Sequence, residues 1–282
     1  MKTKTLLLSL VSACALVAQA ANETLTWIGG SSGAAGESTN WDPNVGNAYV
    51  TGNSYHFVIT NSVNFTVSSA STEYWRNAMT TVTNGAQVTF AGRFWPSSSS
   101  EHVIDVAAGA KFNATYMTGG GALTKTFVKE GEGDFVTPGI GTSGNFKYAR
   151  LRAGTTTTGA LKVTDEIEVC ADAVLKCSGQ NIVYTNDGAT VLHPVVTLDG
   201  VFDCKSVSDG KSKAQRFDGL RGSGVIANAS AGVTLTLVSQ GTEVFSGSIC
   251  GPLTVAPLAG VGADSCFVVG SAYTLKIGRA HV

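Results

Sequence analysis

One short phrase recurs along the chain and limits what it can fold into. Each copy has an apolar residue, two variable positions, a Gly or Asp, and then apolar residues at alternate places. The copies are VTNGAQVTF (82–90), VAAGAKFNA (106–114), VKEGEGDFV (128–136), LRAGTTTTG (151–159), VCADAVLKC (169–177), TLDGVFDC (197–204) and ASAGVTLTL (229–237). Their anchors are Gly85, Gly109, Gly133, Gly154, Asp172, Gly200 and Gly232. The uneven intervals between successive anchors do not suit a propeller or a leucine-rich repeat.

The phrase predicts an all-β fold, a right-handed parallel β-solenoid (β-helix). Gly or Asp supplies the tight corner at which the chain changes direction. Stacked coils bury a continuous column that no single coil could bury. Alternation after each corner points these residues inward: Val88, Phe90, Phe112, Ala114, Leu175, Cys177, Leu235 and Leu237. The alternative is an antiparallel β-sandwich or jelly roll, which also joins short strands through Gly turns.

Composition agrees with a strand-rich globular chain. Charged residues are 14% of the sequence, and 34 of its 282 residues are Gly, which is poor for helices. A hydrophobic content of 43% supports a core, so disorder is not expected. Nucleic-acid binding is not expected either, because no strongly basic stripe appears.

The N-terminus predicts export. Residues 1–20 have two lysines, an apolar run and then Ala-Gln-Ala, the three parts of a secretory signal peptide, with cleavage expected before Ala21. An alternative is lipoprotein processing at Cys14, which ends a lipobox-like Val-Ser-Ala-Cys. We expect residues 21–80 to form an irregular N-terminal cap and residues 81–276 to form the solenoid repeats.

The last six residues have a different character. Ile277-Gly278-Arg279-Ala280-His281-Val282 matches the translation of ATC GGA AGA GCA CAC GTC, which resembles the start of a common sequencing adapter. The alternative is a genuine tail. We interpret 277–282 as an adapter-derived artefact and expect the natural chain to continue differently after Lys276. Without residues 1–20 and 277–282 the chain has 16 basic and 20 acidic residues, so the remainder is mildly acidic.

Three phrases carry a family resemblance. Thr26-Trp27-Ile28-Gly29-Gly30 precedes Asn40-Trp41, and Leu123-Thr124-Lys125 precedes Lys129-Glu130-Gly131-Glu132-Gly133-Asp134-Phe135. The third is GLRGSGVIANASAGVTLTLVSQGTEVFSGSICG (219–251). Together they resemble the autotransporter-associated β-strand repeat proteins of Gram-negative bacteria. The chain departs from that family in having one clear L-x-K…G-x-G phrase and no C-terminal translocator barrel.

This resemblance implies an exported protein on the extracellular or outer-membrane surface, structural or adhesive and without catalysis. Its partners would be extracellular glycans or host and cell surfaces. Contact with a membrane would need a C-terminal anchor or translocator that is missing from this sequence. The resemblance implies no cofactor.

Export makes disulfides an expectation for the cysteines. By the repeat register, Cys177 and Cys204 occupy near-equivalent inward positions on successive coils, within reach of a bridge. Cys250 and Cys266 are a second pair, across a loop rich in Pro and Gly. The alternative is free thiols packed inside the column.

Aromatic residues raise the question of sugar binding. Trp27, Trp41, Trp75 and Trp95 are candidates for stacking on sugar rings. The alternative is that they fill the hydrophobic interior of the N-terminal cap. A basic loop with Lys211, Lys213, Arg216 and Arg221 is a second candidate contact for an anionic glycan, against a solvated loop.

No catalytic, cofactor or metal site is predicted. Glu130, Glu132 and Asp134 alternate and would share a face in one extended strand, but no calcium-loop motif surrounds them. A carbohydrate-active β-helix enzyme would need paired carboxylates. The candidates for such a pair are Asp165, Glu166, Glu168, Asp209 and Asp218. His56, His102 and His193 stand alone in the sequence, without a nucleophile motif.

Overall fold

A computed structural model describes residues 23–44, 55–66, 74–96, 101–117, 124–141, 144–183, 186–187, 190–228, 234–238, 242–250, 254–257 and 266–269. Residues 1–20 and 277–282, the expected signal peptide and artefact, lie outside these ranges. Nearly every regular element is a strand, and the exception is a single 3-10 turn at Ser38–Asn40. In the described part of the chain, no helix has the length and apolar character needed to cross a membrane.

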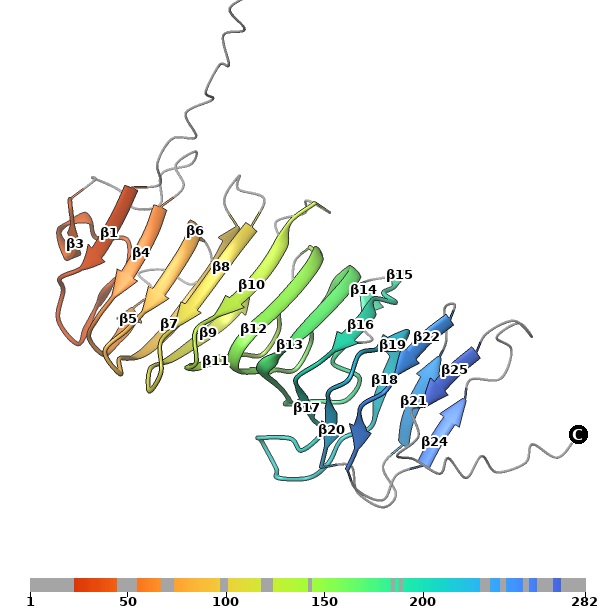
Figure 1. Cartoon of the computed structure of the whole chain (residues 1–282). Coiled ribbons are helices and arrows are strands. Elements are labelled where there is room, and N and C mark those ends of the chain that lie inside the picture. The colour runs from red at the N-terminus through yellow and green to blue at the C-terminus, as the bar shows by residue number, and fades with distance from the viewer. Residues whose placement is uncertain are drawn as a thin grey trace, which may run out of the picture.

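The strands form three rows of parallel neighbours along the molecule (Figure 1). Row 1 contains β1 (Glu23–Trp27), β4 (Tyr55–Ile59), β6 (Tyr74–Val82), β8 (Glu101–Val106), β10 (Thr126–Glu130), β12 (Phe146–Thr158), β13 (Val163–Cys177), β16 (Val195–Leu198), β19 (Leu220–Arg221), β22 (Thr242–Phe245) and β25 (Cys266–Val269). Row 2 contains β2 (Ser32–Ala34), β5 (Val63–Thr66), β7 (Gln87–Pro96), β9 (Lys111–Met117), β11 (Asp134–Thr137), the second halves of β12 and β13, β17 (Val201–Asp203), β20 (Val225–Ala227) and β23 (Ser248–Ile249).

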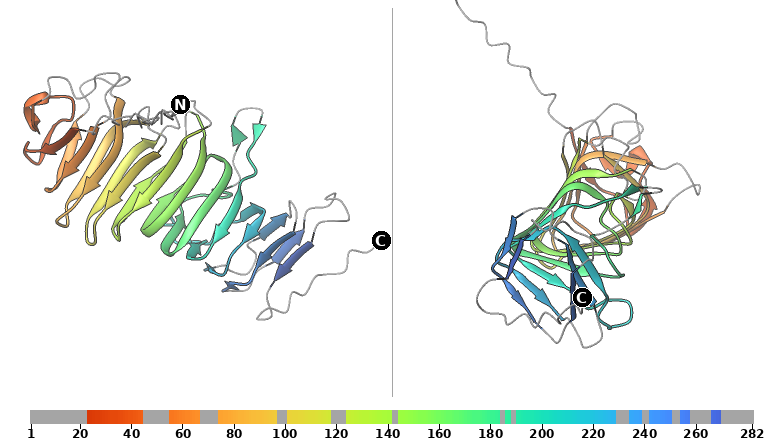
Figure 2. Two further views of the ribbon diagram at one scale, coloured as in Figure 1. Left: turned by 45° about the horizontal axis from the view of Figure 1, so that its top comes forward. Right: turned by 90° about the vertical axis from the view of Figure 1, so that its right-hand side faces the viewer.

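Row 3 begins with the start of β6, the ends of β7 and β9, and bridges at Ile140 and Leu161. It continues as β18 (Gln215–Asp218), β21 (Thr234–Val238) and β24 (Thr254–Pro257). The chain passes from row 1 to row 2 to row 3 and then returns to row 1 beside its previous pass. Figure 2 shows the passes side by side from two further directions.

Antiparallel strand pairing is confined, among the described strands, to two places. β3 (Trp41–Asp42) pairs with β1, and β14 (Asn186–Asp187) pairs with β15 (Thr190–Val191). The predicted all-β class is confirmed, and the alternative of an antiparallel sandwich or jelly roll is wrong.

An inward column runs through row 2. Its members are Val63, Val88, Phe112, Phe135, Thr156, Leu175, Phe202, Ile226 and Ile249, and each is at most 4% exposed. Successive members are register partners on neighbouring strands, although the length of chain between them varies from coil to coil. All eight residues predicted to point inward are buried. The stacked column is therefore continuous along row 2, from β5 to β23.

One predicted copy of the repeat is misplaced. The segment 229–237 was expected to follow 197–204 in the same row, but its described strand β21 belongs to row 3. The strand that follows β17 in row 2 is β20, where Ile226 is the register partner of Phe202. Leu235 and Leu237 are buried as predicted, because the same alternation marks any half-buried strand whichever row it joins.

The corners between rows 1 and 2 use glycine for two reasons. Gly109 and Gly131 have φ of +74° and +72°, which favours a residue without a side chain. Gly133 is not in that region, but a Cβ there would lie 2.3 Å from the carbonyl oxygen of Ala107. Successive corners are thus packed against each other closely enough to exclude side chains.

The region 21–80 is more regular than the predicted cap. β1, β4 and β6 continue row 1 in parallel register, and β6 runs through the expected boundary at residue 80. The described irregular part is the segment 35–44, whose strand β3 pairs antiparallel with β1. β3 pairs with β1 at Thr26 and Trp27. At these two residues it covers the edge of the first strand and so protects that edge from pairing with another chain.

Candidate functional site

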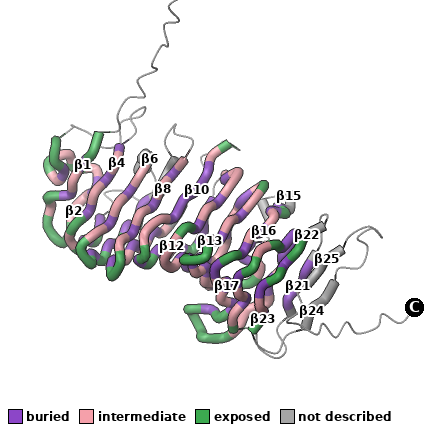
Figure 3. The backbone as a smooth tube through the Cα atoms, viewed as in Figure 1, coloured by how far each residue is buried: buried purple, intermediate pink, exposed green. Residues whose placement is uncertain are grey.

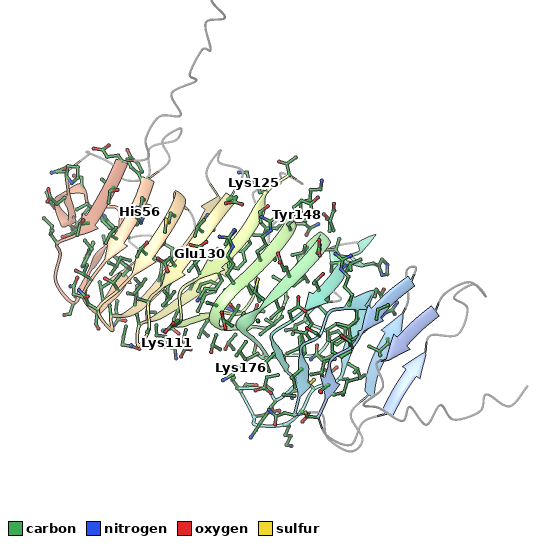
Figure 4. The ribbon with its side chains drawn as sticks, viewed as in Figure 1. His56, Lys111, Lys125, Glu130, Tyr148 and Lys176 are labelled. Carbon is green, nitrogen blue, oxygen red and sulfur yellow. The ribbon has the colours of Figure 1, made fainter. Side chains whose placement is uncertain are left out.

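Charged side chains gather on the outer face of row 1. Buried residues alternate with partly exposed ones along β4 and β8, whereas the first four residues of β10 are all buried, and many of the corners are exposed (Figure 3). His56, Glu130 and Tyr148 lie on this face, on β4, β10 and β12 (Figure 4). Its other charged members include Glu101, Asp105, Arg150, Arg152, Glu166, Glu168 and Arg221. We call this surface the row 1 face.

Ion pairs on the row 1 face connect different coils. Arg150 on β12 lies 3.6 Å from Glu101 of β8 and 3.6 Å from Glu168 of β13. Arg221 on β19 donates to Glu166 of β13 at 2.6 Å, and Thr197 between them bonds to both. These side chains are partly exposed, so each pair stabilises the fold by no more than about 1 kcal/mol.

Two carboxylates are stacked near the corner of the row 1 face. Asp105 of β8 and Glu130 of β10 are direct register partners. Burial raises the pKa of Asp105, and the charge of Glu130 raises it further. The Arg152 guanidinium donates to the Glu130 carboxylate. Glu130 thus has a cationic partner on β12, whereas Asp105 is partly buried beside it.

The register explains why this pair was not predicted. The anchors Gly109 and Gly133 place Lys129 rather than Glu130 beside Asp105. In row 1 the observed partner of Asp105 is Glu130, one position further along, whereas in row 2 Phe112 pairs with Phe135. A shift of one residue reverses which side chains face outward. The sequence signal that could have revealed this pair is the length of the corner: the chain from Asp105 to Phe112 is longer than the chain from Glu130 to Phe135.

Lys129 is buried in the inward column of row 1, between Ile104 and Leu151. Its Nζ donates to the carbonyl oxygens of Glu130 and Gly131, both at 2.7 Å, and of Ala153 at 3.1 Å. Burial lowers the pKa of Lys129 to about 8. Sequence reasoning missed this residue, because lysine is rarely fully buried unless its charge is satisfied.

The acids first considered as a calcium site do not share a face. Glu130 ends β10, Glu132 lies in the corner after Gly131, and Asp134 begins β11 in row 2. Across the described ranges, no three His, Cys, Asp or Glu side chains gather as a group that could hold a metal ion.

The acids considered for catalysis are engaged with cations. Asp165 lies 3.7 Å from Lys147, Glu168 lies beside Arg150, and Asp209 lies 2.5 Å from Lys213. Burial raises the pKa of Glu166, but the hydrogen bonds from Thr197 and Arg221 outweigh it and leave the pKa lowered. Each of these acids thus has a cationic partner of its own.

Asp218 has a different setting at the end of β18. This buried carboxylate accepts from Arg216 at 2.7 and 3.0 Å and bonds the half-exposed His193 through Nδ1. His193 stands alone in the sequence but has a carboxylate partner in the fold. Three members of the predicted basic loop, Lys213, Arg216 and Arg221, face carboxylates, and Lys211 is exposed.

The other two histidines lie in row 1. His56 on β4 bonds Thr81 Oγ1 through Nε2 at 2.9 Å, and burial lowers the pKa of its ring. His102 is fully buried on β8. His56 thus contacts a threonine of the next coil, and His102 belongs to the interior of the stack.

Two of the four tryptophan candidates cannot stack on a sugar. Trp27 and Trp41 are 2% and 1% exposed, and their rings meet edge to face with centroids 5.2 Å apart. Their Nε1 atoms donate to the carbonyls of Gly30 and Ala35. The glycan-contact interpretation is wrong for these two, which fill the interior at the first coils. The side chains of Trp75 and Trp95 lie outside what the structure describes.

The cysteines divide into one stacked pair and one separated pair. Cys177 ends β13 and Cys204 follows β17, one position beyond the register pair Lys176–Asp203. Both are buried free thiols, and Cys177 Sγ donates to the Cys204 carbonyl at 3.0 Å. Cys250 follows β23 in row 2, whereas Cys266 begins β25 in row 1. Among the described strands, no pairing joins Cys250 to Cys266.

Comparison of the chain with protein-family models, with curated proteins and with solved structures gave no match. Family-level support for a function therefore rests on the sequence phrases alone.

Proposed function

We propose that the chain is an exported right-handed parallel β-solenoid that acts as a structural or adhesive element of the cell surface. The observation that carries the solenoid is the order of the rows, since successive passes place parallel neighbours side by side along rows 1 and 2. Row 3 repeats this order with the start of β6 and the ends of β7 and β9, the bridges at Ile140 and Leu161, and β18, β21 and β24. The right hand follows from the general handedness of parallel crossovers. The signal-like residues 1–20 and the resemblance to autotransporter-associated repeats support export from a Gram-negative cell.

The row 1 face supports a structural role. Its arginines join acids on different strands, at Arg150 and at Arg221, so the face ties coils together. The carboxylates and arginines of this face are partly exposed and offer hydrogen-bond acceptors and donors to a glycan or to another cell surface. Attachment to a membrane would use an anchor or translocator encoded after Lys276.

Export is tested by expressing the gene with its natural sequence after Lys276 in a Gram-negative host. We expect the mature protein to begin at Ala21 and to be cleaved by protease added to intact cells. A matched variant lacking residues 2–20 should remain inside the cell and be protected. Full-length protein that keeps Met1 and resists the added protease would contradict the proposal.

Asp105 and Glu130 favour a second candidate function, a carbohydrate-active enzyme. Neighbouring strands lie about 4.8 Å apart, close to the carboxyl separation of about 5–5.5 Å found in retaining glycosidases. The test is release of reducing ends or unsaturated products from a panel of polysaccharides. Activity that is lost in Asp105→Asn and Glu130→Gln, but kept in the corner control Glu132→Gln, would establish the enzyme. No turnover on the panel would leave the structural proposal standing.

A further inference from the structure

A second inward column lies near the C-terminal ends of the row 2 strands, two residues after the first, and its side chains change along the molecule. Its members in order are Phe65, Phe90, Ala114, Thr137, Thr158, Cys177 and Cys204, all at most 4% exposed. The aromatic rings at the start give way to small side chains, and the last two are cysteines on successive coils. Side chains in one column of a parallel sheet are nearest neighbours between strands.

The two thiols lie one position beyond the register pair Lys176–Asp203, so the strand spacing determines their separation. Stacked parallel strands lie about 4.8 Å apart, and disulfides span Cα separations of about 4.4–6.8 Å. The contact of Cys177 Sγ with the Cys204 carbonyl at 3.0 Å shows that the sulfur already points at its neighbour's backbone. A thiol is a weak donor, so this hydrogen bond holds the sulfur only loosely.

The position of the pair matters for the stack. The two cysteines close the passage from β13 to β17, where the register partners Leu175 and Phe202 are separated by the longest stretch of chain between neighbours in the row 2 column. This coil contains the β14–β15 hairpin. A covalent link at that point closes the largest loop between neighbouring coils, where a bridge restricts the unfolded chain most.

We propose that Cys177 and Cys204 form a disulfide that fastens β13 to the coil after the hairpin. The inference rests on the proposed export, because an oxidising compartment supplies the oxidant. One thiolate attacks the disulfide of a donor protein or of oxidised glutathione and expels a donor thiolate. The second cysteine then attacks the mixed disulfide and releases the other donor thiolate. The cysteines lose two electrons and two protons, and the donor disulfide is reduced to two thiols.

The disulfide forms during folding, before Cys177 and Cys204 are buried between the stacked strands. In the closed fold, burial raises the pKa of Cys177 to about 11 and that of Cys204 to about 12. Very little thiolate is then present near neutral pH, and neither sulfur is exposed to a donor. Oxidation thus accompanies folding, and the finished bridge is shielded from reductants.

The test uses two preparations of the full chain, one recovered after export and one refolded from denaturant with reduced and oxidised glutathione. Thiols are alkylated under denaturing conditions without reductant, and the digests are mapped by mass spectrometry. We expect a Cys177–Cys204 linked peptide in both. Reduction during unfolding should lower Tm by roughly 5–10 °C. The Cys170→Ser/Cys250→Ser variant should keep the link and the shift, and Cys177→Ala/Cys204→Ala should show no shift.

Alkylated Cys177 and Cys204 in both preparations, or a link from either one to another cysteine, would overturn the disulfide. A chain that stays inside the cell but forms the link on refolding would contradict export and support the bridge. A chain that starts at Ala21 with both thiols free would support export and refute the bridge.

Discussion

The part of the molecule before the β14–β15 hairpin and the part after it follow the same row order. The two parts differ in the length of their strands and in the side chains that fill their cores. β12 and β13 have 13 and 15 residues and run through rows 1 and 2, whereas β19 and β23 have two residues each. Aromatic rings fill the first part: Trp27, Trp41, Phe57, Phe65, Phe90, Phe112, Phe127, Phe135 and Phe146. The second part is mainly aliphatic, with one edge-to-face pair of rings, Phe202 and Phe217, among its described core residues.

The difference teaches that strand length is not what preserves the register. Leu175, Phe202, Ile226 and Ile249 continue the inward column after the strands shorten. Closely packed corners persist as well, since a Cβ at Gly224 would lie 2.2 Å from the Gly200 carbonyl. Because a stacked chain gains its stability coil by coil, we expect the first part to be the more stable one.

Phe112→Ala should have the largest effect on the first part. Phe112 is fully buried, and its ring lies 5.8 Å from that of Phe135, so removal leaves a cavity costing about 3–5 kcal/mol. Denaturant unfolding measures the total loss, and hydrogen exchange locates it. Phe202→Ala, the matched change in the second part, should increase exchange mainly after residue 195. Equal loss of protection over the whole chain in both variants would remove the distinction between the two parts.

Corner glycines provide a test that crosses both parts. Gly131→Ala and Gly222→Ala each combine positive φ with a Cβ placed 2.3 Å from a carbonyl oxygen, and should cost roughly 3 kcal/mol. Gly109→Ala is the control: φ is +74°, but nothing lies within 4 Å, so only about 1–2 kcal/mol is expected. Thermal unfolding ranks the three. A Gly109→Ala loss as large as the others would show that close stacking of corners is not what requires glycine.

Lys129 should make the unfolding free energy of the first part depend on pH. The pKa of Lys129 falls from 10.5 to about 8 on folding, so above pH 8 the folded chain loses a proton that the unfolded chain keeps. Stability should therefore rise with pH, by up to ~3 kcal/mol between pH 8 and 10.5. In the reduced chain, the thiols of Cys177 and Cys204 act oppositely above pH 9, because folding raises their pKa. The measurement is unfolding free energy against pH for the wild type and Lys129→Met.

Subtracting the Lys129→Met curve from the wild-type curve removes the cysteine contribution, which both proteins share. The difference should rise between pH 8 and 10.5 and be flat below pH 7. A difference that does not change with pH would mean that Lys129 is not buried in its charged form. In the next coils the same column contains Leu151, Val169 and Leu198. These side chains do not titrate, so they should add no pH dependence to the unfolding free energy.

Arg150→Gln should have the smallest effect. Its two ion pairs are partly exposed and long, at 3.6 Å, so the expected loss is below about 1 kcal/mol and fades in high salt. Unfolding at low and high NaCl measures it. A severalfold larger loss that persists in high salt would give the row 1 face a much larger share of the stability of the first part.

Much of the inward pattern was predictable from the sequence, because alternation after a Gly or Asp corner is a local property. Val88, Phe112 and Leu175 were placed inward for that reason and are buried. The row to which a segment belongs is not local, so 229–237 was assigned to row 2 when β21 lies in row 3. Corner length also escaped prediction, and with it the outward partner of Asp105.

The candidate site was harder to predict than the fold. The Asp105–Glu130 pair depends on a two-residue difference between corners, and the bond of His193 to Asp218 joins residues that are distant in sequence. Lys129 is buried against the usual preference of its side chain, since three backbone carbonyls satisfy its charge. Such contacts follow from three-dimensional stacking and have no spacing signature in the sequence.

The central claim, a single register of parallel coils through both parts, is tested most directly by spin-label distances along the outer face of row 2. The positions Thr89, Asn113, Val136, Thr157, Lys176, Asp203 and Ala227 are successive register partners. At about 4.8 Å per strand, labels at Thr89 and Lys176 should lie roughly 19 Å apart, and labels at Thr89 and Ala227 roughly 29 Å. Distances that grow in this proportion support one continuous stack. A Thr89–Ala227 distance equal to or shorter than the Thr89–Lys176 distance would contradict it.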